Sequence, residues 1–414
     1  MQVGPSQPGP SQLSPPKLWP KRAAAITGLL ALIAFTIQSC HKALRDQGCD
    51  LTCYLDGGGL ALAGKTPYDP DAYFEFLYSP FFALAMTPLS ILPAAAASVI
   101  WSLLTAFSLV YLFRTVRDLV ANGRERAFGT WDLVVLVAVA AIGLRIVQTN
   151  FANGQVNLIM VGMVTAFLVA LRNGHNRSAG FWLALAVQTK TVPILLLGLL
   201  LVRGRWRAIG WTAVFGIAMT LLPLLDWGTN TIAVYQDWFT MIDHKLQTYT
   251  IDMGAFTVDT EGNREFFTLR GMLATVWPAT SASAVAQYGC ITTVLGTTLW
   301  LDRSLHARKA QRATVAAISL WLIAALLIAP MSEKHHLGMM LPAVAFGLYA
   351  VIDGNRQRRI ESLVWAGCVA VAIALSKPFP HGPSYFLAIV TTYAWTVRTA
   401  YLPNSSMSRN DAAL

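Results

Sequence analysis

Charged residues are what this sequence has least of. Only 13% of the 414 residues are Asp, Glu, Lys or Arg, whereas 55% are hydrophobic. A soluble domain carries about 25% charged residues, so a protein of this composition could not cover its surface in water. The composition therefore excludes a soluble protein and indicates lipid as a second solvent. Apolar runs of about 17 to 25 residues, each long enough to cross a hydrocarbon core, recur along the chain.

These runs predict helices, because backbone groups in lipid need internal partners and the runs are longer than the alternating segments of a membrane barrel. We expect an all-α polytopic membrane protein with about 11 to 13 transmembrane helices and outer-face loops that carry short interfacial helices. Residues 1–22 should form a disordered cytoplasmic segment, residues 23–402 a single transmembrane domain, and residues 403–414 a cytoplasmic tail.

Other patterns are also missing. The chain has no Gly-rich phosphate-binding loop, which argues against a nucleotide-powered pump, and no internal repeat. Cys40, Cys49 and Cys53 have no second ligand cluster beside them, so we expect no metal site; a disulfide among them would require an oxidising compartment. The apolar run from Ala23 to about Ser39 is interpreted as a retained span. The alternative is a cleaved signal peptide, or a lipoprotein signal that ends at Cys40.

The net charge of +10 fits membrane topology better than nucleic-acid binding. Lys and Arg gather in short cytoplasmic loops of membrane proteins. Here arginines cluster between apolar runs, near positions 172–177, 203–207, 303–312 and 356–359. Most of the 21 acidic residues lie instead in two polar stretches, 41–77 and 226–270. We therefore expect both stretches to be loops on the outer face of the membrane.

The run 178–202 has basic clusters on both sides, so it should enter the membrane and return as two short helices. The natural break is at Gln188–Pro193, because proline removes a backbone donor and disfavours helix just before it. This break places Lys190 at the turn.

A second local prediction concerns Arg114, Arg117, Arg124 and Arg126, which look cytoplasmic. Two full spans at 76–93 and 95–113 would return the chain to the outside before these arginines. Either the first run is re-entrant or the charge rule fails there.

Ionisable and amide side chains beside apolar runs are costly and mark candidate sites. Lys190 in a broken helix would be stabilised by an anionic ligand such as phosphate, or would reach the interface as an ordinary lysine. Asp50 is either a functional carboxylate or the N-cap of a short interfacial helix that starts at Leu51. Three further candidates are Asn153-Gly154-Gln155-Val156-Asn157, Ser332-Glu333-Lys334-His335-His336 and Arg270. For these three the alternatives are a polar helix start, a polar loop and an outer anchor.

In their order along the chain, from about Asp50 to Pro342, these motifs resemble glycosyltransferase family 87. This is a C-type family of membrane enzymes that take sugar from a polyprenyl-phosphate donor. The most specific matches are Gly154-Gln155-Val156-Asn157 and Lys190-Thr191-Val192-Pro193 before Arg203-Gly204-Arg205-Trp206. The others are Asp50-Leu51-Thr52-Cys53-Tyr54, Ala63–Pro70, Phe76–Phe82, Leu269-Arg270-Gly271, and Pro330-Met331-Ser332 with His335-His336. Phe267-Thr268 and Glu333-Lys334 depart from the family pattern.

The resemblance implies a mannosyltransferase-like enzyme of the inner (plasma) membrane with its active site on the outer face. It implies Asp50 as the general base. The donor phosphate would be bound by Lys190, Arg270 and His335, and the substrates by Tyr54, Gln155, Asn157 and His336. A sugar on polyprenyl phosphate already carries a good leaving group, so one carboxylate suffices to take the acceptor's proton, and inversion at the sugar is expected. The expected partners are a polyprenyl-phosphate sugar as co-substrate, a lipid or glycan acceptor and membrane lipids, with no cofactor, metal or nucleic acid.

Two other functions fit parts of the sequence. A secondary transporter would place Lys190 in a discontinuous helix at its substrate site, although such folds usually contain two related halves and none is evident here. A non-catalytic partner in envelope glycan synthesis would bind polyprenyl phosphate without turning over sugar.

Overall fold

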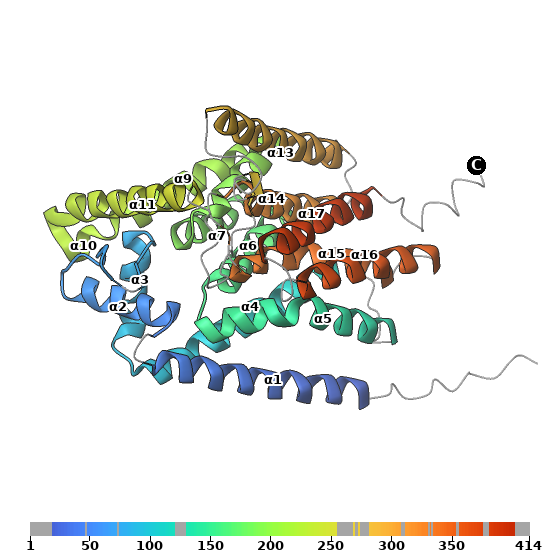
Figure 1. The fold of residues 1–414 in the computed structure, drawn as a ribbon, viewed down its shortest axis with the longest axis horizontal. Helices are drawn as coiled ribbons and strands as arrows, with labels where there is room; N and C mark the ends of the chain where they lie inside the picture. Colours follow the sequence, from blue (N-terminus) through green and yellow to red (C-terminus); the bar gives the residue numbers. More distant parts are fainter. Residues whose placement is uncertain are drawn as a thin grey trace, which may run out of the picture.

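The computed structural model describes residues 19–45, 48–72, 74–120, 130–254, 268–269, 272–273, 281–307, 311–329, 332, 334–352, 356–375 and 381–401. Every regular element in these ranges is a helix (Figure 1). The α-helices are α1 (Trp19–Ala43), α2 (Asp50–Leu62), α3 (Pro80–Ser90), α4 (Ala94–Val120), α5 (Thr130–Asn153), α6 (Asn157–Arg172), α7 (Asn176–Thr189), α8 (Leu196–Val202), α9 (Trp206–Leu221), α10 (Leu224–Trp227), α11 (Thr231–Gly254), α13 (Ser281–Ala307), α14 (Gln311–Ile328), α15 (Leu341–Ile352), α16 (Arg356–Ala374) and α17 (His381–Ala400). Short 3-10 helices are η1 (Val192–Leu195), η2 (Gly228–Asn230) and η3 (Lys334–Met340).

Three helical stretches of the described chain are long and apolar enough to cross a membrane: Ala25–Ala43, Ala94–Val120 and Trp206–Leu246. The pair Ile142–Asn153 and Asn157–Arg172, bent by 111°, would count as a fourth. Further apolar helices in the described part are shorter. The expected all-α membrane architecture is thus confirmed, whereas the expected number of about 11 to 13 spans stays a prediction.

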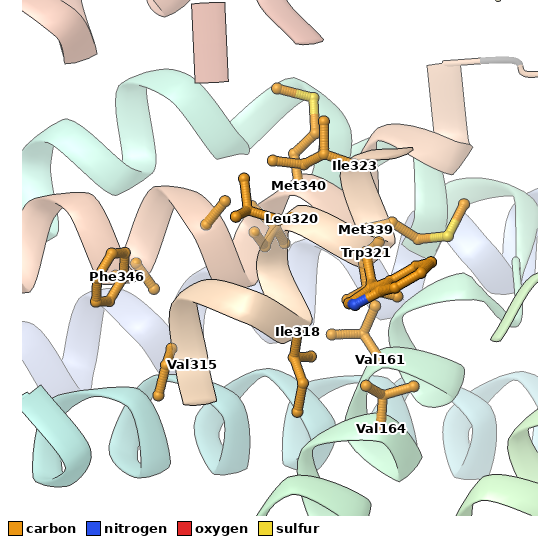
Figure 2. Packing of buried hydrophobic residues seen from close by; sticks show 14 of the residues in the cluster. Val161, Val164, Val315, Ile318, Leu320, Trp321, Ile323, Met339, Met340 and Phe346 are labelled. Carbon is orange, nitrogen blue, oxygen red and sulfur yellow. The ribbon is translucent and has the colours of Figure 1, made fainter. Parts of the chain in front are cut away.

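The centre of the molecule is α14, which is apolar all round and buried on nearly every side, as such a helix must be. Figure 2 shows its Ile318, Leu320 and Trp321 among buried side chains of α6, η3 and α15. Gly198 on α8 permits this packing, because a Cβ there would lie 2.4 Å from the Trp321 ring. Since η3 packs against the same core, the two histidines at its start are held by close-packed structure.

One end of the molecule, at the left of Figure 1, is formed by α2, α3, α10 and α11. We call it the site end. The two acidic stretches meet here, since Trp238 Nε1 donates to the Leu77 carbonyl at 3.2 Å. Lys245 also pairs with Glu75 at 2.5 Å. Both stretches therefore lie at the same end of the molecule.

The first acidic stretch contains α2, which agrees with the short interfacial helices that we expected in these loops. Much of the second stretch is α11, a helix of 24 residues that we did not expect. Val234, Trp238 and Met241 recur at helical spacing on α11 and pack against the cluster formed by α2 and α3. Because acidic residues stand between them in the sequence, we did not predict this apolar face.

For Arg114 and Arg117, with Arg124 and Arg126 outside the described residues, the conflict concerns the run 76–93. This run contains α3, which is only 11 residues long. It packs tightly on α2, where a Cβ on Gly58 would lie 2.8 Å from the Met86 carbonyl carbon. Of α3 and α4, only α4 is long and apolar enough to cross a membrane. It starts at the site end, where Cys40 Sγ contacts the Ala95 carbonyl at 3.6 Å. It carries both arginines toward the opposite end, so the run 76–93 contributes no full span, whereas the side of the membrane on which the arginines lie stays a prediction.

The expected break in 178–202 is confirmed. Helix α7 ends at Thr189, Lys190 is extended (φ −155°, ψ 128°), and η1 and α8 continue from Val192. Helices α7 and α9 run side by side in the same direction, because Gly180 meets Trp211 while Gln188 donates to Thr220 Oγ1 at 2.8 Å.

At the far end of the returning helix α8, the Arg203 side chain is buried against Asp302 at 3.0 Å. Asp302 also accepts from Trp321 Nε1 at 3.0 Å. This buried pair fixes the end of the hairpin against α13 and α14, opposite the turn at Lys190.

Candidate active site

Asp50 is the first residue of α2. The preceding Cys49 is the N-cap: it is extended, and its N–H donates to Thr52 Oγ1 at 2.8 Å. The alternative that Asp50 caps this helix is therefore wrong. Its carboxyl group instead accepts a hydrogen bond from the Gln155 side chain. The side chain is partly exposed, so the carboxylate is both held in place and accessible.

Gln155 reaches Asp50 because the chain bends sharply between α5 and α6. Gly154, at the bend, has φ +64°, in the left-handed region that favours glycine. A Cβ on Gly154 would lie only 2.4 Å from the Leu51 Cβ. The bend therefore fits directly against the first turn of α2, which brings two segments about a hundred positions apart into one site.

A chain of hydrogen bonds leads from Asp50 into the protein. Asn157 Nδ2 donates to Gln155 Oε1 at 3.3 Å, and Asn157 Oδ1 accepts from Lys190 Nζ at 2.8 Å. Lys190 Nζ lies 2.6 Å from His336 Nε2. Gln155 and Asn157 are buried, with 1% and 0% of their surface exposed, so these contacts are shielded from water.

The two histidines occupy the start of η3 and stack with ring centroids 4.3 Å apart. The His335 carbonyl accepts from Asn150 Nδ2 at 3.0 Å, which fixes η3 against the end of α5. Burial, and secondly the Lys190 ammonium, hold the pKa of both imidazoles well below the usual value. Both rings are therefore neutral at physiological pH, and His336 Nε2 accepts from the Lys190 ammonium.

Burial raises the pKa of the Asp50 carboxyl above its usual value. Four interactions lower this pKa: the Lys190 ammonium, the hydrogen bond from Gln155, a hydrogen bond from the Asp50 backbone and the Lys42 ammonium. A carboxylate whose pKa is raised toward the working pH is a stronger base while still ionised near neutrality. The arrangement can therefore accept a proton next to a cation that can hold an anion.

The structure thus brings together six of the predicted residues from four parts of the chain. They are Asp50, Gln155, Asn157, Lys190, His335 and His336. Arg270 lies outside the described residues.

Tyr54 does not join this group, contrary to our expectation. It is fully buried, its hydroxyl lies 2.7 Å from the Tyr78 hydroxyl, and its ring packs against Phe82 and Trp101. Tyr54 therefore stabilises the packing of α2 on α3 and α4 rather than facing a substrate. Although Tyr54 follows Asp50 by one helical turn, Phe82 of α3 and Trp101 of α4 enclose this part of α2.

Two residues near the site were missed in the sequence. Asn150 is a fully buried amide that donates to Ile146 as well as to His335, and it resembles any polar residue at the end of a span. Lys42 donates to Asn153 Oδ1 at 2.5 Å and acts on Asp50. In the sequence it looks like an ordinary cation at the end of the first apolar run. Cys40, Cys49 and Cys53 are free thiols, so the structure has no disulfide among them.

Comparison with known proteins places this arrangement in a family. The model of glycosyltransferase family 87 matches residues 76–330, which is more than half of the chain. The chain belongs to glycosyltransferase family 87. The resemblance noted in the sequence is thus confirmed, and the protein is a glycosyltransferase. The matched range includes Gln155, Asn157 and Lys190, whereas Asp50 and His336 lie outside it.

Curated relatives cover more of the chain than the family model. A Mycobacterium tuberculosis (strain ATCC 25618 / H37Rv) protein is 28% identical over 87% of this chain and 87% of its own. It is named polyprenol-phosphate-mannose-dependent alpha-(1-2)-phosphatidylinositol mannoside mannosyltransferase. A protein of the same name from Mycolicibacterium smegmatis (strain ATCC 700084 / mc(2)155) is 26% identical over 79% of this chain and 74% of its own. A pentamannoside mannosyltransferase of that organism is 23% identical over 84% of this chain and 80% of its own. No solved structure matches the chain.

The family 87 site has no evident place for a metal in the part of the chain that the structure describes. No group of three or more His, Cys, Asp or Glu side chains there could hold an ion. The charged groups around Asp50 are lysines, which bind anions.

Proposed function

We propose that this glycosyltransferase transfers mannose from polyprenyl-phosphate mannose to a lipid acceptor on the outer face of the membrane, with Asp50 as the general base. The names of two relatives support the donor and the class of the acceptor. The observation that carries the proposal is the hydrogen-bonded chain from the Asp50 carboxyl through Gln155 and Asn157 to Lys190. It sets a base and a phosphate-binding cation at a fixed separation.

In the proposed reaction the acceptor hydroxyl attacks the anomeric carbon of mannose as its bond to the phosphate oxygen breaks. The hydroxyl proton passes to Asp50, and the bond electrons leave with polyprenyl phosphate. A phosphate is a good leaving group, so no general acid is needed. Lys190, with its position fixed by Asn157 and His336, would stabilise the charge that develops on the phosphate. Attack from the side opposite the phosphate would invert the anomeric centre.

The outer-face location is part of the proposal. Asp50 and the described parts of the two acidic stretches lie at one end of the molecule, whereas Arg203 and Arg312 lie at the other end, near the start of α14. Positive residues gather on the cytoplasmic side, so the site end should face outward. Lipid-linked donors and acceptors would then reach the site from the outer leaflet.

The test is Asp50→Asn, assayed in proteoliposomes with polyprenyl-phosphate mannose and a phosphatidylinositol mannoside. We expect turnover to fall by about 10²- to 10⁴-fold, because the amide cannot accept the proton. Asp56→Asn is the matched control, since Asp56 lies on the same helix, is exposed, and is not among the groups that shift the pKa of Asp50. Wild-type turnover in a folded Asp50→Asn variant would refute the assignment of Asp50 as the general base. Substrate uptake without covalent product would instead favour a transporter.

A further inference from the structure

Lys42 is a second cation beside Asp50, and nothing in the proposed reaction so far uses it. It lies in the last turn of α1 and is partly exposed. Its Nζ donates to Asn153 Oδ1 at 2.5 Å. The Lys42 ammonium lowers the pKa of the Asp50 carboxyl and of the neighbouring Cys49 thiol, so it lies near the start of α2.

The bend between α5 and α6 holds both lysines in the same way. Asn153 accepts from Lys42, Asn157 accepts from Lys190, and Gln155 between them donates to Asp50. One five-residue segment thus orients two cations and the carboxylate. Among the described residues, these two lysines are the cations that lower the pKa of Asp50.

We propose that Lys42 binds the phosphate of the polyprenyl substrate together with Lys190. This inference depends on the proposed function and adds a second phosphate-binding residue to it.

Charge balance through the reaction supports this assignment. The donor is a phosphodiester with one negative charge, and the released polyprenyl phosphate is a monoester whose second pKa is about 6, which makes it nearly doubly charged at pH 7. The bond from mannose to the phosphate oxygen breaks, the bond to the acceptor oxygen forms, and the proton moves to Asp50. One negative charge therefore leaves Asp50 while one is gained by the phosphate.

Two lysines keep the site neutral throughout this transfer. Before the reaction they balance the Asp50 carboxylate and the diester, and afterwards they balance the phosphate alone. If Lys190 were the single cation that the described residues place beside Asp50, these residues would leave one negative charge uncompensated at both stages, which is costly where water is largely excluded.

The position of Lys42 also suits a lipid phosphate. Helix α1 exposes a row of large apolar side chains, among them Leu30 at 61% and Ile37 at 64%. A polyprenyl chain could lie along this row in the membrane, and Lys42 lies in the last turn of the same helix. Long cationic side chains at the end of a span reach toward phosphates at the interface. The phosphate of a lipid that approaches along α1 would meet Lys42 before the deeper Lys190.

The experiment compares three variants of the full-length protein in nanodiscs: Lys42→Gln, Lys42→Arg and the control Arg45→Gln. Arg45 is exposed, lies three residues further along, and is not among the groups that act on Asp50. Direct binding of polyprenyl phosphate and its inhibition of transfer are both measured. We expect Lys42→Gln to weaken both by about tenfold, as the loss of one charge-assisted contact predicts. Lys42→Arg should restore most of the binding, and Arg45→Gln should change little.

Two further readouts separate this role from a structural one. The KM for the acceptor should stay constant in Lys42→Gln, whereas the acid limb of the pH profile should move upward, because a cation that lowers the pKa of Asp50 has been removed. Unchanged polyprenyl phosphate binding in Lys42→Gln, an equal loss in Arg45→Gln, or a change in acceptor KM alone would overturn the inference. Absence of transfer in the wild type would refute the proposed function, while the binding comparison would still decide the role of Lys42.

Discussion

Gly154→Ala tests whether the bend between α5 and α6 positions Asp50. The substitution adds a single methyl group at a residue with φ +64°. The new Cβ would lie 2.4 Å from the Leu51 Cβ, whereas ordinary contacts begin at 3.4 Å. One of the two backbone segments must therefore shift by about 1 Å. Leu51 is fully buried and directly follows Asp50, so the shift should be felt at the carboxylate.

The expected magnitudes follow from these two effects. A left-handed conformation costs a residue with a Cβ about 1 to 2 kcal/mol, and overpacking of a buried contact costs about 1 to 3 kcal/mol. The free energy of unfolding should therefore fall by about 2 to 5 kcal/mol. A displacement of about 1 Å in a catalytic group can lower the rate by about 10²-fold, so kcat should fall by about that factor.

Gly64→Ala is the matched control. Gly64 has φ +66°, and no atom lies within 4 Å of the position that its Cβ would take. It shares the backbone cost without the collision with Leu51. Mannose transfer and denaturant unfolding in detergent are measured for both variants. If Gly154→Ala loses no more activity and stability than Gly64→Ala, the bend does not press against α2 and our account of how Asp50 is placed is wrong.

Three other perturbations have defined outcomes. Because burial raises the pKa of Asp50, kcat/KM should fall as the pH drops through a value above the usual aspartate pKa of about 3.9; an acid limb at or below about 4 would contradict this. Asp302→Ala should destabilise the protein by about 3 to 5 kcal/mol by leaving Arg203 buried and unpaired, and adding Arg203→Met should recover part of that loss in denaturant unfolding. Gly58→Ala should destabilise α2 by about 1 to 3 kcal/mol, because the new Cβ would lie 2.8 Å from the Met86 carbonyl carbon of α3. Gly59→Ala, with no atom within 4 Å of its Cβ, should stabilise α2 by about 0.5 to 1 kcal/mol. Equal thermal shifts in the two variants would count against the packing of α2 on α3.

The parts of the site that the sequence predicted have strong local signals. The break at Lys190 follows from Pro193 and from basic clusters on both sides of one apolar run. The amides of Gln155 and Asn157 stand out because they begin an apolar segment after a glycine. In each case a few neighbouring residues decide the local backbone, and the structure confirms the break and the bend.

The parts that the sequence did not predict depend on contacts between distant segments. Lys42 and Asn153 are 111 positions apart, and neither is unusual among its own neighbours. Tyr54 lies one helical turn after Asp50, and only the packing of α2 on α3 decides that it faces the core. Similarly, hydropathy marks the run 76–93 as apolar but cannot tell a span from a short helix such as α3, which buries that surface against α2.

The site is built where helices break rather than along their faces, and this has a consequence for stability. Irregular backbone within a membrane protein is tolerated only where its polar groups find partners. Gln155 N–H bonds to the Asn150 carbonyl at 2.8 Å, the Asn150 side chain bonds to the His335 carbonyl at 3.0 Å, and Ser79 Oγ bonds to the Gln188 carbonyl at 2.6 Å. Polar groups at the bend, in η3 and at the end of α7 thus have hydrogen-bond partners within the protein before any substrate arrives. Loss of the Asn150 amide should therefore lower stability and activity together, whereas loss of Lys42, at the exposed edge of the site, should weaken phosphate binding and move the acid limb of the pH profile without lowering stability.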